Sequence, residues 1–317
     1  MFVSWTTWHA RSASLARRLG LEPLFLPRSI QRVPVPLRYL AAWAWMTYHL
    51  CRSRPKILAV MAPPPLAAWC AAIYGRIARV PVLFDLHSGT FNNPKWRWST
   101  RYVLAAAKRG VVLVTNQTHF EICRARGLAV EQVHDLVIDV PETTLARTET
   151  PQDYVLVIAS HAEDEPIEAM LDAAAQLPEL EFIVTGSARP EGKQKAAAIP
   201  NVRLSGYVDA ATYDDLVTSA GLVVCLTTRP DTMQCGGYEA LAFGKPLVTS
   251  DTAVLEEFFG SAACFAGPQP DQLAAAVTRA MASRDKLSSA MRSLRDERVA
   301  ADQDAISRIR HRLAEAR

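Results

Sequence analysis

Short apolar runs alternate with segments of helical periodicity along the first half of the chain. The runs are apolar at consecutive positions, which is typical of strands buried on both faces of a parallel sheet. The pattern predicts strands at 2–4, 24–26, 57–61, 82–85, 111–115 and 133–138, and helices at 12–19, 37–51, 66–78, 99–108 and 119–126. Strand and helix in alternation indicate an α/β domain.

The same alternation begins again after a polar stretch at 141–152, which we interpret as a linker. It predicts strands at 154–158, 181–185, 202–204, 222–226 and 246–249, and helices at 166–177, 211–219, 237–242, 254–259, 272–282 and 287–313. The chain is thus predicted to form two doubly wound α/β domains, 1–147 and 148–299. We expect the last helix, about 300–317, to pack back on the first domain.

Length and charge refine this picture. A chain of 317 residues with 50% hydrophobic and 21% charged residues suits two folded domains. Residues 1–145 carry 18 Lys or Arg against 7 Asp or Glu, whereas the remainder carries 17 against 25. A basic first half suggests an anionic partner, either a phosphorylated acceptor, a membrane surface or nucleic acid. Ordinary surface solvation is the alternative.

The chain shows no secretory or membrane-spanning signal. Residues 1–20 lack an apolar core and carry three Arg, and the apolar stretch 57–74 is interrupted by Pro63, Pro64 and Pro65. The six cysteines have neither paired nor zinc-binding spacing, which favours a reduced, cytoplasmic compartment. Segment 37–51, with Trp43, Trp45 and flanking Arg, reads either as a helix at a membrane interface or as a helix buried beside the sheet. We favour burial.

Candidate chemistry gathers between residues 227 and 251. Ligands of open α/β sheets bind beyond the carboxyl ends of the strands, and this segment follows such an end. Gly236 and Gly237 stand where a helix should begin, so their backbone N–H groups can hold a phosphate. Glu239, in the first turn, can accept hydrogen bonds from two ribose hydroxyls, and Asp231 can reach a sugar hydroxyl. A dipole partner and plain turn chemistry are the alternative readings.

This segment resembles the donor domain of the retaining GT-B glycosyltransferases, especially the family-4-like group. That group has an acidic residue, seven others, then Glu, a helix of small residues and a Gly-x-Pro motif. Asp231, Glu239, Gly244 and Pro246 match it, although Asp replaces the usual first Glu. The resemblance implies two Rossmann-like domains facing across a cleft, and donor contacts at Arg229, Cys235 and Tyr238 besides those above.

The resemblance covers most of the second half. Ser160 and His161 look like the loop after the first strand of that donor domain, Gly186 like its second-strand turn, and Tyr207 like the segment that contacts the base. The family implies transfer from a nucleoside-diphosphate sugar with retention of configuration and without a metal or other cofactor. The sequence shows no clear Asp-x-Asp metal site. As acceptor we expect a glycan or lipid-linked glycan of cell-surface polysaccharide synthesis, at the inner membrane face.

Two departures from the family concern the diphosphate. Residues 160–170 contain no Lys or Arg, and the turn at 4–12 lacks the usual Gly-Gly pair. Arg229, Arg189 or Arg11 are candidate replacements as the phosphate cation. Without such a cation, catalysis could be weak or absent.

The first half offers candidates for acceptor chemistry. Asp85 and His87 end a predicted strand, so Asp85 is a candidate base or orienting group and His87 a candidate sugar ligand or proton donor. His9, Arg11 and Ser12 begin the first predicted helix, where they can contact acceptor or phosphate. A capping Asp, a structural His and an exposed Arg are the alternatives.

Other classes of protein fit less well. A catalytically idle binding or scaffold protein and a nucleotide-sugar epimerase are the rivals that share the fold. A dinucleotide oxidoreductase is disfavoured because no Gly-x-Gly-x-x-Gly follows either first strand. The basic half contains no nucleic-acid reader motif, so we expect no nucleic-acid partner.

Overall fold

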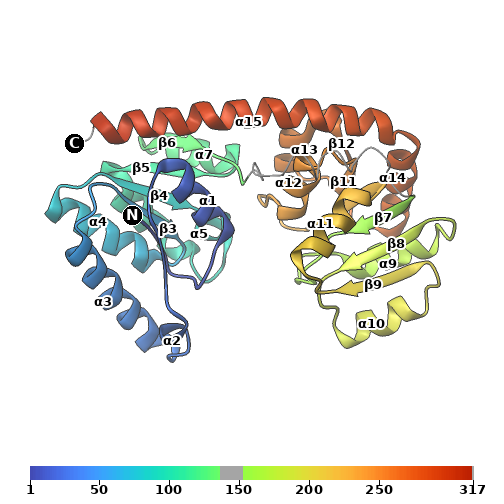
Figure 1. Cartoon of the computed structure of the whole chain (residues 1–317), viewed down its shortest axis with the longest axis horizontal. Coiled ribbons are helices and arrows are strands. Elements are labelled where there is room, and N and C mark those ends of the chain that lie inside the picture. The colour runs from blue at the N-terminus through green and yellow to red at the C-terminus, as the bar shows by residue number, and fades with distance from the viewer. Residues whose placement is uncertain (136–152, 316–317) are drawn as a thin grey trace. The chain divides into compact units, whose positions relative to one another are not determined.

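The computed structural model describes residues 1–135 and 153–315 of the chain. It divides into two compact units, one made of Met1–His134 and the chain from Ala301 onward, and one made of Asp135–Ala300. Each unit holds a six-stranded parallel sheet with helices around it (Figure 1). The α/β class and the tandem arrangement predicted from the apolar pattern are confirmed.

Unit 1 is built on a sheet in the order β2-β1-β3-β4-β5-β6. Its strands are β1 (Phe2–Ser4), β2 (Pro23–Phe25), β3 (Leu58–Ala62), β4 (Val82–Leu86), β5 (Val111–Val114) and β6 (Ala129–Gln132). Its helices are α1 (Ala10–Leu19), α2 (Arg28–Gln31), α3 (Val35–Ser53), α4 (Pro65–Ala78), α5 (Ser88–Asn92), α6 (Thr100–Ala106) and α7 (Gln117–Arg124). The strand order reverses between β1 and β3, where loops diverge at the carboxyl edge.

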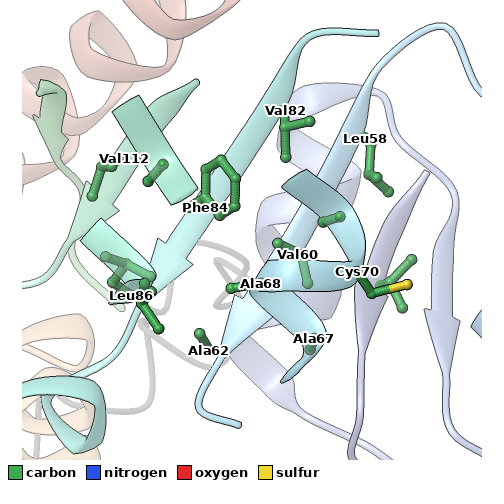
Figure 2. Packing of buried hydrophobic residues seen from close by; sticks show 14 of the residues in the cluster. Leu58, Val60, Ala62, Ala67, Ala68, Cys70, Val82, Phe84, Leu86 and Val112 are labelled. Carbon is green, nitrogen blue, oxygen red and sulfur yellow. The ribbon is translucent and has the colours of Figure 1, made fainter. Parts of the chain in front are cut away.

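Both faces of this sheet are buried, which explains the unbroken apolar runs. Alternate residues of β3 point to opposite faces: Val60 belongs to one core cluster, and Ala59 and Met61 belong to another. On the first face α4 lies against β3 and β4, as Figure 2 shows for Leu58, Val60, Ala62, Ala67, Ala68, Cys70, Val82, Phe84 and Leu86. Because neither face meets water, polar alternation is absent from the sequence.

The second cluster of unit 1 includes the end of the chain. Helix α15 (Arg284–Glu315) contributes Ile306, Ile309 and Leu313 to the cluster that contains Phe2 and Leu15. These side chains are at most 5% exposed. The C-terminal part of α15 therefore completes the apolar core under the first strand of the chain.

Unit 2 has the strand order β12-β11-β10-β7-β8-β9. Its strands are β7 (Tyr154–Val157), β8 (Glu181–Thr185), β9 (Val202–Gly206), β10 (Leu222–Cys225), β11 (Leu247–Ser250) and β12 (Ala263–Ala266). Its helices are α9 (Ile167–Ala175), α10 (Pro190–Ala197), α11 (Ala210–Ser219), α12 (Cys235–Ala242), α13 (Ala253–Phe259), α14 (Pro270–Ala282) and the first part of α15. This is the strand order of dinucleotide-binding sheets, and it reverses between β7 and β10.

Several predicted elements are wrong or incomplete. The last strand of unit 1 is β6, Ala129–Gln132; of the strand expected at 133–138, residues 133–135 form no strand and residues 136–138 lie outside the described residues. Among the α-helices and strands of the described residues, four were not predicted, namely α2, α5, α10 and β12. Helix α10 buries only Ala196, so its sequence carries no apolar stripe, and β12 is only four residues long. The predicted linker at 141–152 and the boundary at 147 lie outside the described residues.

Helix α3 is only partly buried, contrary to the interpretation we favoured. Trp43 and Trp45 pack against the core of unit 1 as expected, but Tyr48 is 62% exposed. Among the described residues, no helix combines the length and apolar character needed to cross a bilayer.

Replacing Ile309 by Ala tests the role of α15 in unit 1. Because Ile309 is fully buried, we expect the free energy of unfolding to fall by about 2–5 kcal/mol. The matched control is Ser307→Ala on the exposed face of the same helix, which should change stability by less than about 0.5 kcal/mol. Urea unfolding followed by circular dichroism measures both. Equal midpoints for the two variants would contradict the packing described.

Candidate functional site

A cavity of about 410 Å³ lies at the point where the strand order of unit 2 reverses. It is lined by the loops that follow β7, β8, β9 and β10, and by the start of α12. Six residues predicted to contact a donor line it: Ser160, Gly186, Tyr207, Arg229, Cys235 and Gly236. Parallel strands bring these segments to one edge although they are far apart in the sequence.

Helix α12 lies directly on the sheet because it begins with glycine. A Cβ atom on Gly236 would stand 2.7 Å from Cys225 Sγ and 2.8 Å from Ile158 Cγ2. A Cβ on Gly237 would meet the ring of Phe259 at 3.0 Å. The space freed by the glycines is therefore filled by the protein's own core rather than kept open for a ligand.

The phosphate cradle predicted at Gly236 and Gly237 needs correction for this reason. The Gly237 N–H donates to the carbonyl oxygen of Gln234 at 3.2 Å. The first backbone N–H groups of a helix have no acceptor within that helix. In α12 these groups belong to Cys235 and Gly236, which line the cavity. The amides suited to a phosphate are thus those of Cys235 and Gly236.

Glu239 lies one turn into α12 and does not itself line the cavity, but it is held by a lining tyrosine that the sequence analysis missed. Tyr213 of α11 lines the cavity, and its hydroxyl donates to Glu239 Oε2 at 2.5 Å. Burial, and to a lesser extent the charge of Asp214, raise the pKa of Glu239, whereas the hydrogen bond from Tyr213 lowers it. The pair is separated by 26 residues, so spacing alone could not reveal it.

Arg229 provides positive charge at the cavity and is already paired. Its guanidinium lies 2.9 Å from Asp164 Oδ1, and Asp164 Oδ2 accepts a hydrogen bond from the Thr227 hydroxyl at 2.8 Å. The Arg229 side chain is 63% exposed. Among the cavity-lining residues that the structure describes, Arg229 is the one basic side chain. The exposed guanidinium can turn toward an anion, and doing so would take this partner from Asp164, whose side chain is 13% exposed.

The loop after β7 is ordered by its own carboxylate. Glu165 accepts hydrogen bonds from the backbone N–H groups of Ser160 and Ala162 and from the Ser160 hydroxyl, at 2.8–3.2 Å. Gly186 adopts a φ of +81°, and a Cβ there would come within 2.2 Å of the Ala159 carbonyl oxygen. The loop therefore closely approaches the turn after β8 only because residue 186 is glycine.

His161 and Arg189 face away from this cavity. They line a second hollow, of about 590 Å³, together with Glu163, Glu168 and Glu191. His161 has a φ of +59°, and its Nε2 donates to the Thr185 carbonyl oxygen at 3.0 Å. Of the three candidate phosphate cations, Arg189 thus lies outside the switch-point cavity.

Three further predicted residues differ in their surroundings. Tyr207 is 82% exposed at the cavity. Tyr238 instead points into the core, where its ring meets Phe258 edge to face at 5.4 Å, so the prediction of a ligand-facing side chain there is wrong. Asp231 is half-buried between the lining residues Arg229 and Thr232 but does not line the cavity itself.

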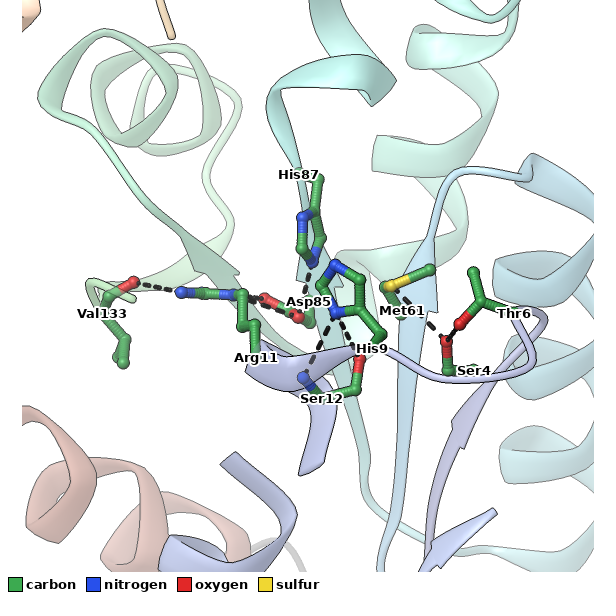
Figure 3. A network of polar contacts seen from close by, with 9 residues as sticks. All are labelled: Ser4, Thr6, His9, Arg11, Ser12, Met61, Asp85, His87 and Val133. Carbon is green, nitrogen blue, oxygen red and sulfur yellow. Dashed lines mark hydrogen bonds and ion pairs between the residues drawn. The ribbon is translucent and has the colours of Figure 1, made fainter. Parts of the chain in front are cut away.

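The candidates of unit 1 form one network around Asp85 (Figure 3). Arg11 donates from Nε to Asp85 Oδ1 at 2.9 Å and from a terminal nitrogen to the Val133 carbonyl oxygen at 2.9 Å. His87 Nε2 lies 3.0 Å from Asp85 Oδ2. The His87 ring meets His9 edge to face at 4.9 Å. His9 Nδ1 in turn accepts from the Ser12 N–H at the start of α1.

This network fixes what each group can do. Burial by itself would raise the pKa of Asp85, but the charges and hydrogen bonds of Arg11 and His87 outweigh it and hold that pKa well below its ordinary range. Such a carboxylate is a poor base and a good orienting group for His87. Arg11 is 5% exposed and bound to Asp85, so the prediction of an anion ligand there is not supported.

Comparison with known proteins identifies the fold. A family model described as glycosyl transferase-like matches residues 163–314. No curated protein sequence matches the chain. The chain is similar to the crystal structure of Anabaena HepE in complex with UDP, with 16% identity over 96% of this chain and 97% of that one and a TM-score of 0.71.

Two other solved structures are similar at lower scores. Sucrose-phosphate synthase from Thermosynechococcus elongatus has 15% identity, covers 88% of this chain and 77% of its own, and gives a TM-score of 0.65. UDP-GlcNAc 2-epimerase from Neisseria meningitidis bound to UDP-GlcNAc has 13% identity, with 92% and 93% covered and a TM-score of 0.65. The chain has the GT-B fold, and residues 163–314 match the glycosyl transferase-like family model.

Replacing Asp85 by Asn leaves the buried Arg11 charge without its counter-ion. We expect the free energy of unfolding at neutral pH to fall by about 3–5 kcal/mol. Because the pKa of folded Asp85 lies below its ordinary value of 3.8, its contribution is complete above pH 3.8 and is lost as the pH falls through the folded pKa. The difference between the two proteins should therefore narrow in acid.

The control for that comparison is Asp153→Asn, which breaks the exposed ion pair with Arg284 and should cost less than about 1 kcal/mol. Urea unfolding at pH 7 and at about pH 3 measures these differences. If Asp85→Asn were as mild as the control at neutral pH, Asp85 would not be the counter-ion on which Arg11 depends.

Proposed function

We propose that the chain is a glycosyltransferase whose second unit binds a nucleoside-diphosphate sugar in the switch-point cavity. The observation that carries this proposal is the place of the cavity, at the strand reversal of a domain that matches a glycosyl transferase-like family. Sheets of this topology bind nucleotides at that point. Solved structures of the same fold contain UDP, UDP-glucose and UDP-GlcNAc, which supports a nucleotide sugar here.

The cavity and the residues beside it suggest roles for several of the predicted donor residues. The exposed ring of Tyr207 offers a stacking surface for a base. Glu239, oriented by Tyr213, is the acceptor for ribose hydroxyls. The backbone N–H groups of Cys235 and Gly236, at the N-terminus of α12, are the candidates for hydrogen bonds to the diphosphate. Asp231, near the rim, is the candidate for the donor sugar.

Arg229 is the proposed diphosphate cation. The candidate Arg11 is buried against Asp85 in unit 1, and Arg189 lies in the other hollow of unit 2. Arg229 is exposed and reaches the cavity. On binding, its guanidinium would exchange Asp164 for the phosphate oxygens, which stabilises the leaving diphosphate by a charge-assisted contact.

We propose that unit 1 serves the acceptor. His87, held by Asp85, is the candidate for a contact with the sugar or for proton transfer, with His9 and Ser12 beside it. A glycan or lipid-linked glycan assembled at the cytoplasmic face of the membrane is the acceptor class that we propose. Retention of configuration and independence from metals follow from the family resemblance.

A nucleotide-sugar epimerase is the second candidate. The observation that favours it is the likeness to epimerases bound to or named for UDP-GlcNAc. Incubation with a donor and no acceptor separates the two activities, because an epimerase then yields the isomeric nucleotide sugar and a transferase does not. An idle binding protein, suggested by the pairing of Arg229 with Asp164, would bind donor and yield neither product.

Binding of nucleotide sugars is expected to depend on Glu239. Calorimetry with UDP-, GDP-, ADP- and dTDP-sugars should show one preferred donor, bound at least about tenfold more weakly by Glu239→Ala, since a hydrogen bond to a charged acceptor contributes about 1.5–3 kcal/mol. The control Glu257→Ala, an exposed glutamate of α13, should bind as the wild type does. If the folded protein bound none of these donors, the proposal would fail.

Donor affinity should also depend on pH through Glu239. The acceptor role requires the carboxylate, so affinity is lost as the pH falls through the pKa of Glu239, which lies above its ordinary value of 4.5. Tyr213→Phe removes the hydrogen bond that lowers this pKa, so the loss should occur at a higher pH in the variant. Dissociation constants measured across the acid range test this. Superimposable pH profiles would show that Tyr213 does not act through Glu239.

A further inference from the structure

Acidic residues are almost absent from a long stretch of unit 1. Residues 23–84 contain eight Lys or Arg and no Asp or Glu, and residues 23–120 contain thirteen Lys or Arg and a single acidic residue, Asp85. Asp85 is fully buried and neutralised by Arg11. The surface that this stretch presents to solvent is therefore positive, with no carboxylate to offset it.

Helix α3 in this stretch has an exposed apolar stripe besides its core face. Ala42, Met46 and Leu50 point into the core of unit 1. On the opposite side, one turn after another carries an exposed residue that is not charged: Leu37, Leu40, Ala44, Tyr48 and Cys51. The steps of three and four residues keep them on one face, and Leu37, Leu40 and Tyr48 are each more than half exposed. A helix of a water-bound surface would carry charge there.

The neighbouring helix α4 also exposes apolar side chains. Ile73 and Ile77, one turn apart, are 51% and 79% exposed. The Tyr74 hydroxyl donates to the Leu50 carbonyl oxygen at 3.0 Å, which joins the C-terminal turns of the two helices, and Figure 1 shows α3 and α4 side by side. Arginines stand exposed around those turns at positions 52, 54, 76 and 79.

We propose that this α3–α4 face docks on a bilayer that contains anionic lipids. The face consists of Leu37, Leu40, Tyr48, Ile73 and Ile77 with Arg52, Arg54, Arg76 and Arg79. Aliphatic side chains enter the boundary between headgroups and acyl chains, the tyrosine ring suits the headgroup level, and the guanidinium groups bind lipid phosphates. The proposal uses only unit 1 and is independent of the donor site.

Two other occupants fit the face less well. A nucleic acid would satisfy the arginines, but it offers no apolar environment for Leu40 and Ile77. A second copy of the chain would cover the apolar residues, but it would bring the arginines of both copies together without any acidic residue in between. Only an anionic lipid surface satisfies the apolar and the basic residues at once.

The test is partition of the full chain onto vesicles of phosphatidylcholine, with and without phosphatidylglycerol, measured by co-sedimentation. The wild type should bind the mixed vesicles and not the neutral ones. Arg52→Glu with Arg76→Glu should weaken binding at least about tenfold, because each basic group near an anionic surface contributes roughly fivefold. Leu40→Ser with Ile77→Ser should weaken vesicle binding as well. High salt should remove a larger fraction of the binding of this variant than of the wild type, because only the ionic contacts remain.

The control carries the same charge change on unit 2, Lys193→Glu with Arg203→Glu, and should bind vesicles much as the wild type does. All replaced side chains are exposed, and circular dichroism checks that each variant is folded. Failure of the wild type to bind mixed vesicles, or equal binding by every variant, would overturn the proposal. Two further results would overturn it if vesicle binding were unchanged in the variants. One is binding of an RNA oligonucleotide that depends on the arginines alone. The other is a dimer that Leu40→Ser with Ile77→Ser dissociates.

Discussion

The geometry of unit 2 depends on the contact between the first turn of α12 and the two central strands. Gly236 sits so close to Ile158 and Cys225 that even a methyl group would collide with both. Only a helix without side chains at this point can approach the carboxyl edge of β7 and β10. That approach places the amides of Cys235 and Gly236 at the cavity and sets Glu239, one turn later, within reach of Tyr213. The position of this wall of the cavity is thus set by the packing of α12 on the sheet.

The key ion pair of unit 1 is buried, whereas the arginine at the cavity of unit 2 is exposed. In unit 1 Arg11 and Asp85 are both buried and neutralise each other, and this ion pair ties α1 to β4 and to the chain after β6. Removing either partner would leave a charge in an apolar core, so these groups are committed to structure. In unit 2 Arg229 is exposed and its pairing with Asp164 is open to exchange. An exposed cation at the cavity suits a charged ligand that must be bound and released.

The sequence was sufficient for the architecture and only partly so for the site. Buried parallel strands give unbroken apolar runs, and for that reason the positions of β3, β5 and β10 could be predicted. Helix α10 could not, since it buries little more than Ala196. Among site residues, the Gly236–Glu239 segment could be found because a family motif marks it. Its contact with Tyr213 could not, because the contact is formed by the packing of α11 beside α12.

The direction of a side chain was the hardest property to infer. Tyr238 stands between two residues of the motif and yet points into the core, because position 238 is on the face of α12 that meets Phe258. Arg11 follows the first strand, as a phosphate ligand would, but its guanidinium is bound to the buried carboxylate of Asp85, 74 residues away. Neither outcome can be read from one segment, because each depends on a partner brought near by the sheet.

The central claim is that a nucleotide binds at the strand reversal of unit 2. Hydrogen–deuterium exchange with and without saturating UDP, the nucleotide in the similar Anabaena structure, tests it most directly. The account predicts slower exchange in the segments 158–165, 206–213 and 227–239, which contain most of the residues that line the cavity. Binding of UDP that leaves these three segments unchanged, with protection elsewhere, would contradict it.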